Sequence, residues 1–226
     1  MAQMRAAIVL AAGSSSRMGS SKALLPWDGT TLVGYAVREL LAAGASRIVV
    51  VVGADAEQVL AAIPKLDAIV PVVNDGFASG RSSSIRLGAA AIRSACDSLI
   101  VLSVDQPCPS AILRRLYEAA EVDGIDVAVP AFDGRRGHPI CLAGRLLPEL
   151  ANVSEEDEGL RAVVRRHADA RREVQVDSPI VHLNLNDRAA YADALRGDRL
   201  VLRNEGRQET GDRRGNENEV GAEGAR

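Results

Sequence analysis

Short runs of aliphatic residues alternate along this chain with stretches whose apolar residues recur at helical spacing. Residues 6–10, 47–52, 69–73 and 98–104 are apolar runs, most of them rich in Val or Ile, which is typical of strands buried on both faces. Strands that alternate with helices form right-handed crossovers and parallel sheets. We therefore predict a single-domain α/β fold, a mostly parallel Rossmann-like sheet with helices on both faces.

The stretches between these runs carry the helical pattern. Residues 32–43 place aliphatic side chains on one face and are followed by Gly44, a common stop signal. Further helices are predicted at residues 56–63, 83–94 and 110–120, the last of them capped by Ser110. Beyond residue 131 we predict a turn at 132–134, short strands at 127–130, 139–142 and 172–176, and helices at 146–150, 158–167 and 188–195.

The chain has 226 residues, long enough for one sizeable core. From Asn204 onward it has almost no apolar residues, and such a segment cannot offset the entropy lost on ordering. We therefore predict one folded domain over residues 1–203 and a disordered polar tail over residues 204–226.

Charge and cysteine usage exclude several classes of protein. The net charge of −3 argues against a nucleic-acid-binding protein, which usually carries a basic stripe. The apolar run at residues 6–12 is too short to span a membrane. The three cysteines have no metal-ligand spacing and form a poor disulfide framework, so we expect a reduced, cytoplasmic setting.

The segment that follows the first predicted strand has the features of a phosphate-binding loop. It reads Leu10-Ala11-Ala12-Gly13-Ser14-Ser15-Ser16-Arg17-Met18-Gly19-Ser20-Ser21-Lys22. Glycines let the backbone approach a ligand, and successive N–H groups can hold phosphate oxygens, to which Arg17 and Lys22 add positive charge. The spacing fits neither the Walker loop nor the dinucleotide pattern G-x-G-x-x-G. The alternative is a tight turn in which Arg17 is a surface charge.

This segment resembles the signature of nucleotidyltransferases that attach nucleotides to molybdopterin. It is also similar to wider relatives that act on sugar phosphates and methylerythritol phosphate. The resemblance runs from Ala6 to Leu195 and implies the nucleotide-diphospho-sugar transferase type of fold. It implies that Arg17 and Lys22 are catalytic. The nucleotide-binding residues that it implies here are Leu10, Ala11, Ala12, Gly13, Arg17 and Lys22.

A second matching segment, Val104-Asp105-Gln106-Pro107, follows a predicted strand. The family places its catalytic, magnesium-binding aspartate in such a turn, and a carboxylate at this edge can bind Mg²⁺ that is carried by nucleotide phosphates. The alternative is that Asp105 caps the next helix. Close relatives carry Asp-Ile-Asp-Thr-Pro-Glu-Asp near the C-terminus, but this chain has Asn184-Leu185-Asn186-Asp187-Arg188. Asn186 is the candidate second metal ligand, and Asp187 stays open as an alternative.

A third segment, Asn74 with Gly80-Arg81-Ser82-Ser83-Ser84, resembles the cytidylyltransferase branch of the family. The resemblance implies nucleotide binding by Asn74 and Ser82 and substrate binding by Ser83 and Ser84. Serine hydroxyls and N–H groups at a helix start can bind phosphate. The alternative is that these serines only cap the helix that follows.

A fourth segment, Gly137-His138-Pro139, is similar to the Gly-His-Pro of the same branch. A histidine between Gly and Pro is held in a fixed turn, and the resemblance implies that His138 binds the acceptor substrate. The alternative is a surface turn beside the solvated side chains of Arg135 and Arg136. We interpret His167 and His182 as structural.

These resemblances together imply transfer of CMP from CTP to molybdopterin or the molybdenum cofactor, with Mg²⁺ and release of pyrophosphate. Ala12 matches the cytidylyl branch, whereas residues 184–186 are closer to the guanylyl branch. The expected partners are CTP or another NTP, a phosphorylated pterin, and the apo-form of a molybdenum hydroxylase, with no nucleic acid and no membrane. The alternatives are a guanylyltransferase for the same cofactor, a sugar-phosphate nucleotidyltransferase, a non-catalytic cofactor chaperone and a nicotinamide-dependent reductase.

Overall fold

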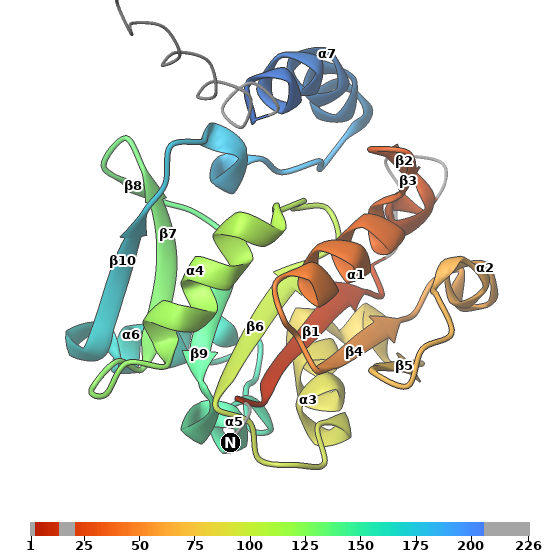
Figure 1. Ribbon diagram of the computed structural model, residues 1–226. Helices are drawn as coiled ribbons and strands as arrows, with labels where there is room; N and C mark the ends of the chain where they lie inside the picture. Colours follow the sequence, from red (N-terminus) through yellow and green to blue (C-terminus); the bar gives the residue numbers. More distant parts are fainter. Residues whose placement is uncertain (1–2, 14–20, 206–226) are drawn as a thin grey trace, which may run out of the picture.

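The computed structural model describes residues 3–13 and 21–205 as one sheet with helices packed on both faces (Figure 1). Within these residues the main sheet has eight strands, in the order β10-β7-β9-β6-β1-β4-β5, and β8 pairs with β7. The strands of the main sheet are β1 Arg5–Ala11, β4 Arg47–Val52, β5 Ile69–Val73, β6 Ser98–Ser103, β7 Val127–Phe132, β8 Arg135–Arg136, β9 Ile140–Ala143 and β10 Arg171–Gln175. The predicted α/β fold is confirmed.

The sheet is mostly parallel, as the alternation of strand and helix patterns predicts. β1 pairs in parallel with β4 and β6, β4 pairs with β5, and β10 pairs with β7. The short strands β8 and β9 are antiparallel to their neighbours. β9 lies between β6 and β7, so the chain after β7 turns back into the sheet before it continues to the C-terminal part.

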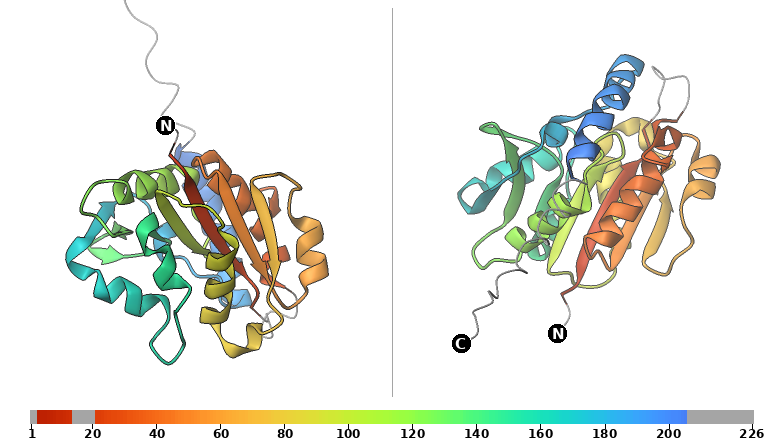
Figure 2. Two further views of the ribbon diagram at one scale, coloured as in Figure 1. Left: turned by 90° about the horizontal axis from the view of Figure 1, so that it is seen from below. Right: turned by 45° about the horizontal axis from the view of Figure 1, so that its top comes forward.

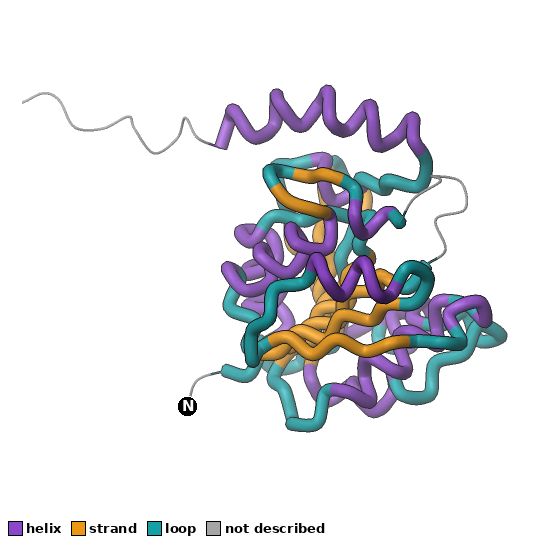
Figure 3. The backbone as a smooth tube through the Cα atoms, turned by 90° about the vertical axis from the view of Figure 1, so that its right-hand side faces the viewer, coloured by secondary structure: helices purple, strands orange, loops and turns teal. Residues whose placement is uncertain are grey.

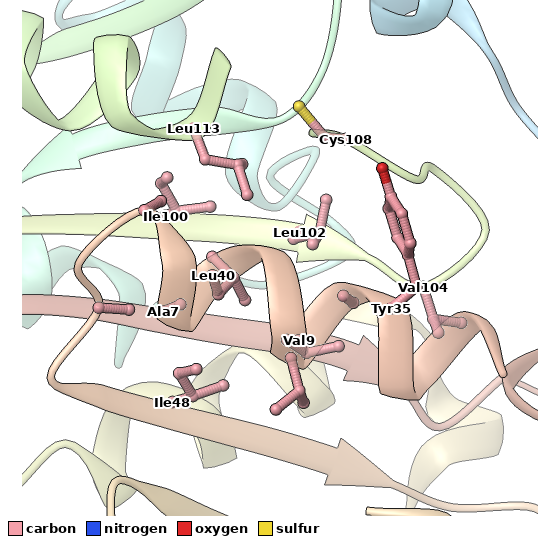
Figure 4. Packing of buried hydrophobic residues seen from close by; sticks show 14 of the residues in the cluster. Ala7, Val9, Tyr35, Leu40, Ile48, Ile100, Leu102, Val104, Cys108 and Leu113 are labelled. Atoms are coloured by element: carbon pink, nitrogen blue, oxygen red, sulfur yellow. The ribbon is translucent and has the colours of Figure 1, made fainter. Parts of the chain in front are cut away.

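Strict alternation along the central strands builds two cores, one on each face of the sheet. Ala7 and Val9 of β1 point into one cluster, whereas Ala6 and Ile8 point into the other, and all four are fully buried. The helices α1 Leu32–Ala42 and α4 Ser110–Ala120 cover the first face, and α3 Arg81–Ala91, α5 Leu147–Leu150 and α6 Leu160–Arg166 cover the second (Figure 2). On the first face, Leu40 packs over the β-strands (Figure 4).

The remaining elements lie around these layers. α7 lies across the top of the molecule, above the end of the sheet where the parallel strands finish (Figure 3). None of the helices in the described ranges is long and apolar enough to cross a membrane. The remaining elements are α2 Ala56–Ala62, α7 Arg188–Glu205, the hairpin strands β2 Pro26–Trp27 and β3 Thr30–Thr31, and the 3-10 turns η1 Lys22–Leu24, η2 Phe77–Ser79, η3 Gly144–Leu146, η4 Ala168–Ala170 and η5 Pro179–His182.

The structure corrects three details of the predicted helices. The helix expected at residues 83–94 begins earlier, at Arg81, because Gly80 has a φ of +111° that only glycine adopts easily. Ser110 does not cap α4 with its side chain; Pro109 is at the cap, and the Ser110 N–H donates to Glu39 Oε2 at 2.8 Å. The last helix is longer than predicted and ends at Glu205, whereas the predicted division between domain and tail at residue 204 stays a prediction. Residues 206–226 of the predicted tail lie outside the described residues.

The sequence interpretation also missed the β2–β3 hairpin. Asp28 and Gly29 form its turn with φ values of 44° and 76°, the left-handed pair that two-residue hairpins favour. The hairpin buries Trp27, whose ring packs edge-on against Tyr35 of α1. The strands have two residues each, which is too short for an alternating pattern to reveal.

His167 joins three segments of the second face, as its predicted structural role requires. Its Nδ1 lies 2.8 Å from Asp126 Oδ2, and its Nε2 lies 2.7 Å from Glu149 Oε1. Arg145 pairs with Asp126, and Arg166 pairs with Glu149. Partial burial lowers the pKa of His167, but the hydrogen bonds to Glu149 and Asp126 outweigh this effect and raise the pKa above its ordinary value.

We predict that this contact makes the stability of the protein pH-dependent. Because the folded pKa is raised, the contribution is complete below the unfolded pKa of about 6.5 and is lost as pH rises through the folded pKa. His167→Gln therefore lowers the free energy of unfolding by about 1 kcal/mol at roughly pH 6 and by much less at roughly pH 9. Urea unfolding at both pH values measures this difference.

The matched control is His182→Gln, because the His182 Nε2 faces the carbonyl oxygen of Arg135. An equal loss of stability at both pH values for His167→Gln would contradict the charged interaction.

Candidate functional site

The carboxyl end of β1 leads directly into the predicted phosphate-binding loop. β1 ends at Ala11 and is followed by Ala12 and Gly13, and Ser21 precedes the 3-10 turn η1. A Cβ on Gly53 would lie 2.6 Å from the Ala12 carbonyl oxygen, so the end of β4 packs directly against the start of the loop. Arg17, which the sequence predicts as catalytic and nucleotide-binding, lies outside the described residues together with the rest of residues 14–20.

A first cleft of about 390 Å³ opens at this edge of the sheet. The predicted residues Leu10, Ala11, Ala12, Gly13, Lys22, Ser84 and Asp105 all border it. The other lining residues are Ser21, Ala23, Phe77, Ala78, Gly80, Arg81, Ser103 and Val104. The structure thus gathers one loop, the N-terminal end of α3 and the end of β6 around a single hollow.

Lys22, Asp105 and Asn186 meet at the edge of the first cleft. The Lys22 Nζ lies 3.1 Å from Asp105 Oδ2 and 3.4 Å from Asn186 Oδ1. The Leu185 N–H donates to the Asp105 carbonyl oxygen at 2.9 Å, which fixes the C-terminal segment against the end of β6. Side chains from three distant parts of the sequence therefore meet here, and two oxygen atoms lie beside the Lys22 ammonium.

This arrangement fits a hydrated divalent cation that arrives with a nucleotide. The Asp105 and Asn186 oxygens already converge on the Lys22 ammonium, which shows that both can reach one positive centre. Mg²⁺ in proteins is usually held by one or two carboxylates together with substrate phosphates and waters. The described residues contain no cluster of three or more His, Cys, Asp or Glu side chains suited to a metal, so the protein alone offers a partial shell.

Asn74 lies directly behind the first cleft and organises the start of α3. It is 1% exposed, and its Nδ2 donates to the Ser83 and Ser84 hydroxyl oxygens at 2.9 Å each. Its Oδ1 accepts from the Gly76 N–H at 3.0 Å. The serines do not cap the helix with their side chains; Ser83 Oγ instead donates to the Gly80 carbonyl oxygen at 2.8 Å. The described contacts thus give Asn74 and Ser83 a scaffold position, and their predicted ligand-binding roles stay predictions.

A second cleft of about 410 Å³ opens beside the first. The predicted residues Ser82 and His138 border it, and Arg81 borders both clefts. The other lining residues are Ile85, Val101, Gln106, Ile140, Glu155, Glu158, Gly159, Leu160, Arg161 and Asn184. Because the two hollows share the Arg81 wall, ligands in them would lie next to each other.

The surroundings of His138 in the second cleft disfavour the protonated form of its imidazole. Loss of hydration lowers the pKa of His138, and the positive charge of Arg81 lowers it further. Arg81 lies at the first position of α3, where desolvation lowers its pKa while Asp105 and Glu155 oppose the change. The ordinary pKa of arginine is so high that its guanidinium remains charged. The imidazole of His138 therefore lies near a fixed positive charge that, together with burial, disfavours its protonation.

The sequence interpretation missed Arg81, Arg161 and Glu155. Arg81 stands inside the Gly80-Arg81-Ser82-Ser83-Ser84 segment that the sequence analysis selected, so its place at a helix start was a usable signal. Glu155 and Arg161 lie in and after the connection between α5 and α6. Nothing in the local sequence distinguishes them from ordinary surface charges.

The chain belongs to the family of MobA-like NTP transferase domains, whose family model matches residues 7–171. The predicted resemblance is therefore confirmed at the level of the family. The match begins in β1 and ends at the first residue of β10, so it covers both clefts apart from the C-terminal segment that carries Asn184 and Asn186.

Proteins that are similar to this chain in sequence have names that denote different activities. A nicotine blue oxidoreductase of Paenarthrobacter nicotinovorans is 36% identical over 166 residues, which are 70% of this chain and 80% of that protein. The bifunctional protein GlmU of Agrobacterium fabrum is 36% identical over 160 residues, 67% of this chain, but the match spans only 34% of GlmU. The molybdenum cofactor cytidylyltransferase of Escherichia coli is 27% identical over 136 residues, 60% of this chain and 68% of that protein.

Solved structures share the fold over most of the chain. Rv0371c from Mycobacterium tuberculosis superposes with a TM-score of 0.74 at 29% identity, covering 87% of this chain and 100% of that one. A complex of Rv0371c with manganese has a TM-score of 0.70 at 28% identity, covering 86% of this chain and 99% of that one. A structural relative thus binds a divalent metal ion.

The buried amide of Asn74 generates a stability prediction. Asn74→Ala leaves the Ser83 and Ser84 hydroxyls and the Gly76 N–H without their partner, so the free energy of unfolding falls by about 2 kcal/mol. Denaturant unfolding measures the loss. The control is Asn152→Ala, an exposed amide that donates to the Pro148 carbonyl oxygen. If Asn74→Ala unfolds like the wild type and loses only nucleotide affinity, Asn74 is a ligand group and not a scaffold.

Proposed function

We propose that this protein transfers CMP from CTP to molybdopterin or its molybdenum-bearing form and releases pyrophosphate. The observation that carries the proposal is the contact of Lys22 with Asp105 and Asn186 at the carboxyl edge of the sheet, where Lys22 and Asp105 line the first cleft. Ligands of open α/β sheets bind at this edge. The chain's membership of the MobA-like NTP transferase family supports the same reaction class.

The triphosphate binds along the loop that follows β1. Backbone N–H groups near Gly13 approach the phosphates without a side chain in the way, and Lys22 supplies a positive charge at the cleft wall. The resemblance to the family assigns Arg17 to the same task. When the nucleotide enters, the Lys22 ammonium moves away from the Asp105 carboxylate and binds phosphate oxygens.

Asp105, with Asn186 beside it, would hold the divalent cation. When bound there, the cation would neutralise charge that develops on the phosphates. The departure from the aspartates of close relatives makes Asn186 a neutral ligand, so Asp105 supplies the negative charge of the pair. Glutamate or aspartate side chains elsewhere in the described residues form no larger cluster that would take over this role.

The chemical step needs no general base from the chain. An anionic oxygen of the acceptor phosphate attacks the α-phosphorus of CTP, a new P–O bond forms, the bond from the α-phosphorus to the bridging oxygen breaks, and pyrophosphate leaves with that electron pair. Catalysis of this kind is mainly positioning and charge neutralisation. Lys22 balances the charge of the triphosphate side, and Arg81 stands on the wall between nucleotide and acceptor.

The relative named nicotine blue oxidoreductase makes oxidoreductase activity the second candidate. The similarity covers 80% of that protein, and its name denotes a reaction that does not release pyrophosphate. One observation argues against oxidoreductase activity. The loop that follows β1 lacks the G-x-G-x-x-G fingerprint of nicotinamide-dependent enzymes. A guanylyltransferase, a sugar-phosphate nucleotidyltransferase and a non-catalytic cofactor chaperone complete the alternatives.

One assay separates these candidates. Pyrophosphate release is measured with each of the four NTPs, with and without molybdopterin, and NADH and NADPH oxidation is followed in parallel. Release that requires both CTP and molybdopterin supports the proposal. Cofactor oxidation without pyrophosphate release supports the oxidoreductase, and release with GTP alone assigns the chain to the guanylyl branch.

We predict that Asp105→Asn lowers turnover at least tenfold, because it removes the negative charge that would hold the cation. Its free energy of unfolding stays near that of the wild type, since the side chain is partly exposed and the shape is kept. The control is Asp67→Asn, an exposed carboxylate before β5. Wild-type turnover of folded Asp105→Asn at saturating Mg²⁺ would refute the metal assignment.

We predict that kcat/KM for CTP exceeds that for GTP by about tenfold or more, which is about 1.4 kcal/mol of discrimination. The Cβ of Ala12 narrows the cleft beside β1, where a base lies in this proposal. Ala12→Gly therefore raises kcat/KM for GTP and changes that for CTP less. Equal values for both nucleotides in the wild type would argue against the cytidylyl branch and leave the reaction class intact.

A further inference from the structure

The C-terminal segment around the start of α7 contacts the segment after the phosphate-binding loop at two points. The Lys22 Nζ lies 3.4 Å from the Asn186 Oδ1, and the Tyr191 hydroxyl donates to the Pro26 carbonyl oxygen, where α7 lies beside the β2–β3 hairpin (Figure 1). Lys22 and Pro26 are close in the sequence, and so are Asn186 and Tyr191. Because the two contacts join the same two segments, together they fix one segment against the other.

Hydrogen bonds within each segment connect its two contacts. On the first side, the 3-10 turn η1 begins at the first contact and β2 begins at the second. On the other side, the Asp187 Oδ1 accepts from the Ala190 N–H at 2.9 Å, and the Asp187 carbonyl oxygen accepts from the Tyr191 N–H at 3.1 Å. The first turn of α7 therefore begins directly after Asn186, so a shift of Tyr191 also moves Asn186.

The Asn186 side chain depends on its neighbours for its position, because it is exposed and neutral. On one side of it, Leu185 is fully buried and its N–H donates to the Asp105 carbonyl oxygen at 2.9 Å. On the other side, α7 is held by the Tyr191 hydroxyl. An amide oxygen attracts a cation less than a carboxylate does, and ordering a free side chain on binding costs free energy. A ligand of this kind contributes more when it is already in place.

We infer that Tyr191 is a positioning residue of the cation site. Its hydroxyl holds the start of α7 against the hairpin and thereby keeps the Asn186 amide oxygen close to Asp105. The inference rests on the proposed function for the placement of a divalent cation at Asp105 and Asn186. Tyr191 is not among the described residues that line the two clefts, so it acts through Asn186 and does not touch a substrate there.

Trp27 allows the position of α7 to be measured independently of the cation. It is the one tryptophan of the chain and is 2% exposed. It borders a hollow of about 310 Å³ together with Ala194 and Gly197 of α7, so a displaced α7 would open the indole to a soluble quencher. Because coupling between two equilibria is reciprocal, a bound cation should in turn hold α7 in place.

The test uses Mn²⁺ alone as the probe, titrated into the full chain and followed by water-proton relaxation. Tyr191→Phe keeps the ring and removes the hydroxyl, and it is expected to lower the affinity for Mn²⁺ about fivefold. It also raises the quenching of Trp27 by acrylamide, and Mg²⁺ reverses this rise. The matched control is Tyr117→Phe, which loses a bond of the same type, to the Ala6 carbonyl oxygen at 2.8 Å at the opposite end of β1. The control lowers stability in urea and leaves the affinity for Mn²⁺ unchanged.

A double-mutant cycle shows whether Tyr191 acts through Asn186. Asn186→Ala removes the amide oxygen and lowers the affinity for Mn²⁺ by itself. If the only effect of Tyr191 is to position that oxygen, Tyr191→Phe causes no further loss in the Asn186→Ala background. A purely structural hydroxyl would leave the affinity for Mn²⁺ unchanged in both backgrounds.

Three results would overturn the inference: no binding of Mn²⁺ by the wild type, unchanged affinity in Tyr191→Phe, or an equal loss of affinity with and without the Asn186 amide. Pyrophosphate release by the wild type together with unchanged Mn²⁺ affinity in Tyr191→Phe would overturn it while the proposed function stands. The expected Mn²⁺ pattern without pyrophosphate release from any NTP would support the positioning role and remove the proposed function.

Discussion

The parallel pairing of β1 with β4 on one side and β6 on the other is the constraint on which the rest of the molecule depends. It satisfies the backbone of β1 along both edges, and both faces of the strand are buried. The register aligns Leu10 with Ser103 and Ala11 with Val52, so the neighbouring strands finish at one level. The loop after β1 and the turn at Asp105 consequently meet at one edge, although they are far apart in the sequence.

Those parts of the fold that follow from a repeated local pattern could be predicted from the sequence. The aliphatic runs identify the central strands, because a strand buried on both faces has few polar positions. The glycine loop and Asp105 could therefore be placed at the carboxyl ends of these strands. The hairpin around Asp28 could not be found, since its strands are two residues long. Nor could the position of β9 between β6 and β7, because pairing partners depend on the whole sheet and not on the strand itself.

The residues of the first cleft could be predicted better than those of the second, because the first is formed by contiguous motifs and the second by segments far apart in the sequence. The first cleft is built mostly from contiguous motifs, and the predicted residues of the glycine loop that are described line it together with Lys22 and Asp105. The second cleft combines α3, β9, the connection after α5 and the segment before α7. The positions of Arg161 and Glu155 in the cleft could not be predicted from the local sequence. They line the cleft only because α6 and the loop before it pack against the start of α3. The hydrogen bond from Leu185 to Asp105 likewise brings Asn186 to the site from outside any motif.

Charge distribution connects the two clefts into one reaction path. At the first cleft, the Lys22 ammonium lies against the Asp105 carboxylate. In the proposed reaction the phosphates of an entering nucleotide take the place of this carboxylate beside Lys22, so the ammonium keeps a negatively charged partner. At the second cleft, Glu155 is bound to the backbone of α3 and Glu158 to Arg165, and the charges of Asp105 and Glu155 act on the guanidinium of Arg81. Arg81 stands on the common wall, where in the proposed reaction two substrate phosphates approach each other against their mutual repulsion. A fixed guanidinium at that point lowers the repulsion most when the two phosphates are closest, which is the geometry of phosphoryl transfer.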